Sequence, residues 1–211
     1  MEQKSKIKDK GEGLTLPLVE QFYTVQGEGF HSGKAAYFIR IGGCDIGCRW
    51  CDSKISWSPG IHKMVSIEEI VQNVLDTPAK AVVVTGGEPT LYNLEPLSVK
   101  LQKNNIETFI ETSGAYELTG TWDWICLSPK PNVQPHPSNY LKANELKVII
   151  YDTEDIEWAE KCAQNINNKC LKFLQPEWSR YSVNIGDIVE YVKNNPEWRI
   201  SLQSHKFMKI P

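Results

Sequence analysis

"GGCDIGCRWCDS", residues 42–53, brings Cys44, Cys48 and Cys51 together in one short polar loop. The residues just before it, AAYFIRI (35–41), have the apolar, aromatic and β-branched composition of a buried strand. The loop therefore follows the carboxyl end of that strand. In α/β sheets and barrels this end of a strand carries the active site, so we predict that the cysteine loop belongs to the functional site.

Apolar strand-like runs alternate with helical patterns along most of the chain, which is typical of βα units around a mainly parallel sheet. The clearest helix is SIEEIVQNVLD (66–76), where Ser66 is a plausible N-cap and Glu69 follows three residues later. Further strands are predicted at 80–84, 106–111, 122–127, 145–151, 170–175 and 199–203, and further helices at 94–105, 155–167 and 186–195. The proline-rich segment 129–140 is predicted to be a surface loop.

The length of the chain limits the architecture. A complete eight-unit barrel takes about 250 residues, and this chain has 211. We therefore expect an α/β fold, an incomplete (β/α) barrel of about six strands. It would form a single domain over residues 1–211, with 1–12 as a flexible tail.

The composition of the chain limits the classes of partner that we expect. The formal net charge is −3, and lysine and arginine form no stripe that would follow a phosphate backbone, so we expect no nucleic-acid partner and favour a small molecule. No apolar run approaches the roughly 18 residues of a membrane helix, and the start MEQKSKIKDK lacks the apolar stretch of a signal peptide. The expected location is the cytoplasm, with no membrane partner.

In a reducing compartment, clustered cysteines are interpreted as metal ligands. Three thiolates spaced C-x3-C-x2-C can face one point and hold a 4Fe-4S cluster, which leaves one iron open. A structural zinc site is the alternative, with Cys126 or His62 as a distant fourth ligand. Cys126, Cys162 and Cys170 are scattered among apolar neighbours and are predicted to be core residues.

With Trp50 beside its last cysteine, the loop resembles that of the radical S-adenosylmethionine superfamily. GGEP (86–89), at the end of the next strand, resembles the superfamily's motif for the methionine moiety, and its glycines let the backbone approach a ligand closely. Within the superfamily, residues 19–52 resemble the 7-carboxy-7-deazaguanine synthase family. TGGEPTL, ETSG, LSPKP, LQP and SHKFMKIP match in the same order. A glycyl-radical activating enzyme shares the cysteine spacing but is not expected to combine QGEG with the terminal HK.

The resemblance implies a lyase that converts 6-carboxy-5,6,7,8-tetrahydropterin to 7-carboxy-7-deazaguanine with loss of ammonia, in 7-deazapurine biosynthesis upstream of queuosine. It implies a 4Fe-4S cluster, S-adenosylmethionine and Mg²⁺ as cofactors. The radical formed from S-adenosylmethionine would abstract hydrogen from C6 of the substrate and later return it. The resemblance also implies an electron donor such as flavodoxin and a homodimer.

The family's site residues carry over to positions of this chain. The cluster ligands are Cys44, Cys48 and Cys51, and Mg²⁺ would bind Ser53. The expected S-adenosylmethionine contacts are Trp50, Cys51, Asp52, Gly86, Gly87, Glu88, Ser128, Pro129, Lys130, Gln175, Pro176, Glu177 and Trp178. The expected substrate contacts are Val25, Gln26, Gly27, Glu28, Arg40, Thr85, His205 and Pro211. Arg40 would bind the substrate carboxylate, Glu28 the guanidine-like edge of the pterin, and the carboxylate of Pro211 its N–H donors.

Overall fold

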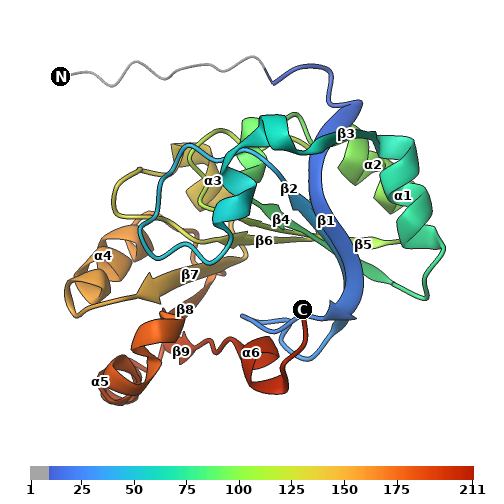
Figure 1. Cartoon of the computed structure of the whole chain (residues 1–211). Helices are drawn as coiled ribbons and strands as arrows, with labels where there is room; N and C mark the ends of the chain where they lie inside the picture. The colour runs from blue at the N-terminus through green and yellow to red at the C-terminus, as the bar shows by residue number, and fades with distance from the viewer. Residues whose placement is uncertain (1–9) are drawn as a thin grey trace.

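The computed structural model describes residues 10–211. Its elements are arranged around one nine-stranded sheet of order β3-β1-β2-β4-β5-β6-β7-β8-β9 (Figure 1). The strands are β1 (Thr15–Val25), β2 (Ala35–Ile41), β3 (Lys63–Ser66), β4 (Ala81–Gly86), β5 (Glu107–Thr112), β6 (Trp124–Leu127), β7 (Glu145–Ile150), β8 (Leu171–Pro176) and β9 (Trp198–Ile200). The α-helices are α1 (Ile67–Leu75), α2 (Glu95–Lys103), α3 (Pro137–Lys142), α4 (Glu154–Ala163), α5 (Tyr181–Asn194) and α6 (Ser204–Met208).

The sheet is parallel from β2 through β9 and ends in two antiparallel strands. The predicted parallel βα pattern is confirmed, and the sheet contains one more parallel strand than the six expected. The pattern did not predict the antiparallel edge. There β1 forms a hairpin with β2 that is closed by Gln26 N–H donating to Lys34 O at 2.8 Å, and β3 pairs with the start of β1.

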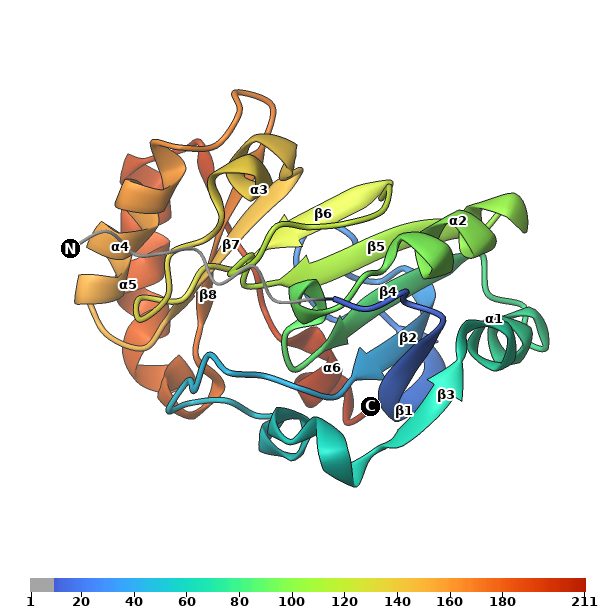
Figure 2. The same ribbon diagram turned by 90° about the horizontal axis from the view of Figure 1, so that it is seen from above.

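Five helices cover the outer face of the curved sheet, with α1 and α2 toward the β1 side and α4 and α5 beside β7 to β9 (Figure 2). Ser66 caps α1 as predicted, because its side chain accepts a hydrogen bond from Glu69 N–H at 3.1 Å. Two apolar clusters fill the space between sheet and helices. One is built around β1 to β5 with α1 and α2, and the other around β6 to β9 with α3 to α5.

The inner face of the sheet carries the side chains that alternate with those outer cores. Val82 and Val84 of β4 belong to the first core, whereas Val83 packs with Ala36, Ala81 and Phe109 inside the curve. Toward their carboxyl ends, β2, β4 and β5 continue this inner face with Arg40, Thr85 and Glu111, which line the cavity described below.

The prediction that the proline-rich segment 129–140 is a surface loop is wrong for its last part. Helix α3 begins at Pro137, where proline's missing N–H and fixed φ suit the first turn. Asn139 is fully buried and donates to Gly114 O and Tyr116 O at 2.8 and 2.7 Å. This amide fixes the loop after β5, which explains why the segment packs inward.

Most of the predicted flexible tail, residues 1–9, lies outside the described residues. Within the described part, the Lys10 ammonium hydrogen-bonds Glu117 O, and Asn93 N–H donates to Lys10 O at 3.4 Å. Across residues 10–211, no helix combines the length and apolarity needed to cross a membrane.

Candidate active site

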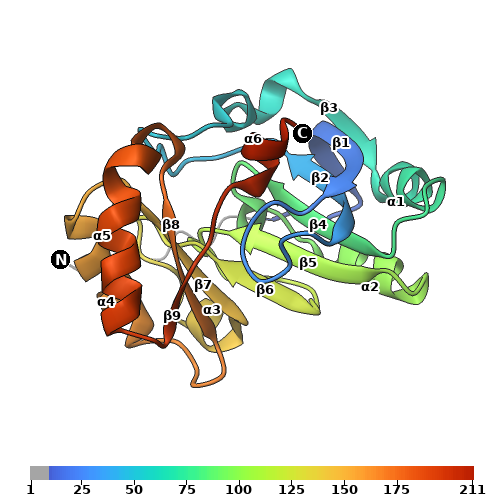
Figure 3. The same cartoon turned by 90° about the horizontal axis from the view of Figure 1, so that it is seen from below.

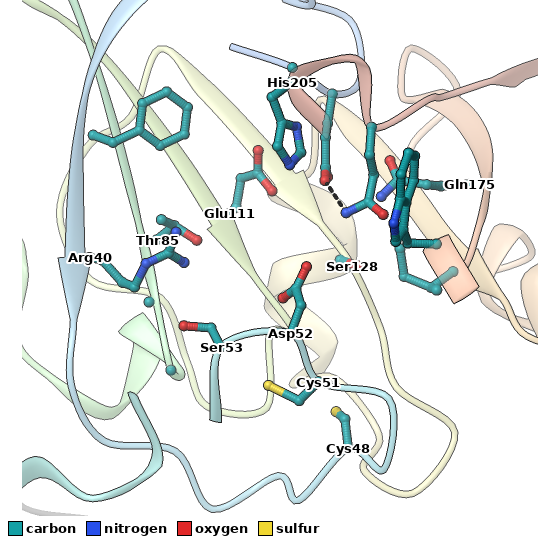
Figure 4. Close-up of a pocket in the computed structure, with 18 of the residues that line it drawn as sticks. Arg40, Cys48, Cys51, Asp52, Ser53, Thr85, Glu111, Ser128, Gln175 and His205 are labelled. Atoms are coloured by element: carbon teal, nitrogen blue, oxygen red, sulfur yellow. Dashed lines mark hydrogen bonds between the residues drawn. The ribbon is translucent and has the colours of Figure 1, made fainter. Parts of the chain in front are cut away.

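A cavity of about 570 Å³ opens at the carboxyl ends of the strands (Figure 4). It brings together every site residue predicted from the sequence except Pro129, which is not among its lining residues. The cysteine loop forms one wall, and α6, with the C-terminus, lies across the opposite side, next to the β1–β2 hairpin (Figure 3). Residues far apart in sequence therefore meet in one chamber.

The cysteine loop is held by its backbone. Cys44 N–H donates to Trp57 O at 3.1 Å, and Cys51 N–H donates to Cys48 O at 3.2 Å. The indole Nε1–H of Trp57 points at Cys51 Sγ from 3.4 Å. Such a bond favours a sulfur that carries negative charge, as a metal-bound thiolate does.

All three loop thiols line the cavity. Burial raises the pKa of the Cys44 and Cys48 thiols. Within residues 10–211, no three His, Cys, Asp or Glu side chains are arranged as a metal site, so the thiols must turn toward a common point to hold a cluster. Their shared loop and all-sulfur chemistry fit an iron-sulfur cluster with three protein ligands.

The residues suggested as a fourth zinc ligand do not join this group. Cys126 is buried below the cavity and hydrogen-bonds Glu145 Oε1 at 3.6 Å. His62 Nε2 lies 2.9 Å from Ile55 O, outside the cavity lining. Cys126, Cys162 and Cys170 are all buried, which confirms the prediction that these three are core residues.

The GGEP turn packs directly on the cysteine loop. Gly87 N–H donates to Ile41 O and Glu88 N–H to Gly43 O, both at 2.8 Å. A Cβ at Gly87 would lie 2.2 Å from Gly43 O and 2.9 Å from the Cβ of Cys44, so only glycine allows this approach. The turn thereby forms a bare backbone wall beside the thiols, as a methionine-binding segment requires.

The carboxylate of Glu88 organises this wall from behind. It is 1% exposed, and Oε1 accepts from Thr90 N–H at 2.9 Å, from the Thr90 hydroxyl at 2.6 Å and from the Thr112 hydroxyl. Oε2 accepts from Ser113 N–H at 2.9 Å and from the Ser113 hydroxyl. Both oxygens of Glu88 are thus occupied by the protein, and their hydrogen bonds fix the shape of the turn.

Glu88→Gln should therefore reduce the free energy of unfolding by about 3 kcal/mol, because the amide nitrogen replaces an acceptor that two donors share. Chemical denaturation of the purified protein measures this change. Glu68→Gln, at an exposed carboxylate paired with Lys100 at 2.7 Å, is the matched control and should leave the stability close to that of wild type, because solvent screens an exposed ion pair. Equal losses in the two variants would contradict the role given to Glu88.

Lys130 and its neighbours form the adjoining wall. The Lys130 ammonium donates to the Ser128 hydroxyl at 2.7 Å and lies 5.6 Å from the centre of the Trp50 ring. Burial lowers its pKa, while the nearby Cys48 acts in the opposite direction. These three predicted cofactor residues are thus brought together. Gln175 at the end of β8 is fixed by the Ser201 hydroxyl at 2.6 Å and lies farther along the same wall.

On the substrate side, Arg40 and Thr85 are partners in the β2–β4 register and lie together beside Ser53 (Figure 4). Arg40 Nε–H donates to Glu20 Oε1 at 2.6 Å, which leaves the terminal nitrogens of the guanidinium for another anion. The Ser53 hydroxyl lies 2.7 Å from the Ser56 hydroxyl. The guanidinium of Arg40 and the hydroxyls of Thr85 and Ser53 therefore lie at one end of the cavity.

The C-terminal segment closes the opposite side. Ser204 N–H and its hydroxyl both donate to Gly27 O, at 2.9 and 2.8 Å. A Cβ on Gly27 would lie 2.3 Å from His205 Nδ1, so glycine is required where the tail packs on the hairpin. Lys206 reaches Asp52 Oδ2 at 3.2 Å, and Pro211 lines the cavity. The tail thus links the substrate side to the cysteine loop.

Sequence reasoning missed a charged group at the base of the chamber. Lys147 on β7 contacts Glu28 Oε2 at 2.6 Å and Glu111 Oε2 at 2.8 Å. A signal was present, because Glu145 and Lys147 interrupt the apolar strand ELKVII two residues apart and must share one face. Gln203, which donates to Glu28 Oε1 at 2.8 Å, was also missed.

Comparison with known proteins agrees with this geometry. Residues 38–123 match the model of the radical SAM superfamily. The 7-carboxy-7-deazaguanine synthase of Flavobacterium psychrophilum is 52% identical over 96% of this chain and 95% of its own, and that of Synechocystis is 43% identical over 93% and 94%. The crystal structure of QueE from Escherichia coli superimposes with a TM-score of 0.78 at 30% identity and covers 91% of this chain and 95% of that one.

Fold, cysteine loop and superfamily match together define a radical S-adenosylmethionine enzyme, a class that implies a 4Fe-4S cluster and S-adenosylmethionine. The near full-length relatives are more specific. The chain belongs to the 7-carboxy-7-deazaguanine synthase family. The comparisons do not favour a glycyl-radical activating enzyme or a zinc-stabilised binding module.

Proposed function

We propose that this protein is a lyase that converts 6-carboxy-5,6,7,8-tetrahydropterin to 7-carboxy-7-deazaguanine with release of ammonia, a step of 7-deazapurine biosynthesis upstream of queuosine. The observation that carries the proposal is the meeting of two groups in one cavity. A three-cysteine loop lies at one end, and a chamber lined by Arg40, Glu28 and Glu111 lies beside it. The substrate has a carboxylate and a guanidine-like edge, which these groups complement.

The cluster would be held by Cys44, Cys48 and Cys51, with S-adenosylmethionine along the Gly86–Gly87 backbone, Ser128 and Lys130. When bound, these cofactors supply the one-electron chemistry that removes hydrogen from the substrate. The protein's own task is to hold C6 of the tetrahydropterin at one place and to keep water out of the chamber.

Positioning follows from the charges in the cavity. Arg40 binds the substrate carboxylate through its terminal guanidinium nitrogens, since the rest of the fork is held by Glu20. Glu28 and Glu111, which also line the cavity, accept from the amino and ring N–H groups of the pterin. Thr85, Gln26, His205 and Pro211 line the space between them and complete the substrate pocket.

Ser53 is proposed as the Mg²⁺ ligand, because a hydroxyl oxygen beside the substrate carboxylate suits this ion. Ser53→Ala should raise the Mg²⁺ concentration for half-maximal activity by at least about tenfold, the cost typical of disturbing a metal's surroundings. A Mg²⁺ titration of the initial rate measures it, with Ser58→Ala outside the cavity lining as the control. Wild-type dependence in Ser53→Ala would mean that the ligand lies elsewhere.

The family resemblance also supports a cytoplasmic homodimer that receives its electron from a small donor such as flavodoxin. Neither nucleic acid nor membrane is proposed as a partner.

Metal analysis and turnover test the function together. Anaerobically purified protein should be brown, with about four iron and four sulfide per chain. Supplied with a reductant, S-adenosylmethionine and the tetrahydropterin, it should form 7-carboxy-7-deazaguanine. Colourless protein with stoichiometric zinc would instead indicate a zinc-stabilised binding module.

A further inference from the structure

Lys147 is almost completely enclosed at the base of the substrate chamber. Its side chain is 2% exposed, yet its ammonium lies 2.6 Å from Glu28 Oε2 and 2.8 Å from Glu111 Oε2. The three residues come from β7, the β1–β2 hairpin and β5. Burying a lysine is costly unless its charge is paired, so the pairing with two carboxylates is what keeps this cation inside the barrel.

Both carboxylates are also fixed through their second oxygens. Gln203 Nε2–H donates to Glu28 Oε1, and Gln26 Nε2–H donates to Glu111 Oε1, each at 2.8 Å. The side chains of Glu28 and Glu111 remain 15% and 21% exposed, in contrast to Lys147 beneath them. Because a carboxylate has about four acceptor positions, each still has lone pairs that face the cavity.

Lys147 is the cation that keeps Glu28 charged. Burial by itself would raise the pKa of Glu28, but the charge and hydrogen bond of Lys147, together with a hydrogen bond from Gln203, lower it to about 2. Burial likewise opposes the charge of Lys147, and the surrounding acids outweigh it and raise its pKa well above the usual value. The other titratable groups around these three residues are Glu145, which also lies on β7, and Cys126, Lys130 and His205 from neighbouring segments.

Those neighbours do not replace Lys147. Burial lowers the pKa of both Lys130 and His205, which weakens each as a cation. Burial also raises the pKa of the Cys126 thiol well above its ordinary value, and neither this thiol nor Glu145 can supply a positive charge. The charge state of Glu28 therefore depends on one lysine.

We infer that Lys147 is a positioning residue, which aims the carboxylates of Glu28 and Glu111 into the cavity and holds Glu28 ionised, so that both accept the N–H donors of the reduced pterin. This inference rests on the proposed function and assigns the residue beneath its substrate site. A protonated carboxyl would present an O–H donor to an N–H donor, which is repulsive. Loss of the lysine thus weakens substrate binding through the protonation state of Glu28 and the position of both acids.

Lys147→Met in the cluster-loaded enzyme tests this role. At neutral pH we expect the KM for the tetrahydropterin to rise about 30-fold or more, with a smaller change in kcat. Without the cation, burial raises the pKa of a carboxyl, so kcat/KM should fall as the pH is lowered from about 9 to 6 and recover at the alkaline end. Lys172→Met, at a partly exposed ion pair with Glu197, is the control and should behave as wild type.

An infrared spectrum gives a readout that does not depend on activity. Lys147→Met should show the carbonyl band of a protonated carboxylic acid at neutral pH, and wild type and Lys147→Arg should not. Lys147→Met leaves two enclosed carboxylates without a partner, which is costly for folding. The double variant, Lys147→Met with Glu111→Gln, carries one negative charge fewer. It should show the same pH shift, which then comes from Glu28 alone.

Two outcomes would overturn the inference. One is a folded Lys147→Met enzyme with unchanged KM and pH profile and only a lower melting temperature, which would make the lysine merely structural. The other is no new carbonyl band. Failure of the proposed function is distinguishable, because wild type would then form no deazapurine while the infrared comparison would still report whether Lys147 controls the two acids.

Discussion

Replacing Cys44, Cys48 or Cys51 with alanine is expected to abolish both the iron-sulfur cluster and all turnover. The three thiols share one loop and line one cavity, and a cluster that already has only three protein ligands has none to spare. Iron and sulfide analysis of each anaerobically purified variant, with the product assay, measures the effect. We expect cluster content near zero and activity below detection in all three.

Cys162→Ala supplies the matched control. Cys162 is 1% exposed and packs in the second apolar core, where it accepts from the Tyr140 hydroxyl at 3.6 Å. Its loss should cost about 1 kcal/mol of stability and leave iron content and turnover close to wild type. If all four variants lost their iron equally, the ligand assignment would be wrong.

The second large effect is expected at Arg40. Arg40→Met keeps the apolar stem but removes the charge that faces the substrate carboxylate, so we expect the KM to rise about 100-fold. The estimate corresponds to about 3 kcal/mol, the upper range for hydrogen bonds to a charged group. Steady-state kinetics with the tetrahydropterin at saturating S-adenosylmethionine measures it.

A ligand without the carboxylate separates this role from a general disturbance. A tetrahydropterin lacking the 6-carboxylate should inhibit wild type and Arg40→Met with equal affinity, because the missing group is the one that Arg40 binds. Arg199→Met, on β9 and outside the cavity lining, should leave the KM unchanged. Weaker inhibition of Arg40→Met by that analogue would show that Arg40 acts on the pocket as a whole.

Local patterns explain why much of the fold could be predicted. The strand 35–41 agrees with β2 residue for residue, and the Ser66 cap forms as expected, because both depend on residues adjacent in sequence. The position of the cysteine loop followed from the rule that parallel strands carry function at their carboxyl ends. The helix at Pro137 was missed because its support, Asn139 to Gly114, joins segments far apart in the chain.

The candidate site shows the same difference between features set by adjacent residues and features that join distant segments. The cysteines and glycines of the cofactor side can be recognised from their residue type and spacing, so this side of the site could be predicted. The group of Glu28, Glu111 and Lys147 is assembled from three strands or loops, and only the sheet order reveals that the lysine lies beneath both acids. In the sequence, the local sign of Lys147 was the presence of two charged residues, Glu145 and Lys147, in an apolar parallel strand.

We propose that the three-cysteine loop and the charged chamber together carry out one reaction on a reduced pterin. The most direct test incubates the reduced, cluster-loaded protein with 6-carboxy-5,6,7,8-tetrahydropterin and S-adenosylmethionine, and quantifies deazapurine, ammonia and methionine together. We predict equal amounts of 7-carboxy-7-deazaguanine and ammonia over many turnovers, with little methionine, because S-adenosylmethionine is regenerated. Methionine that accumulates without any deazapurine would contradict the account.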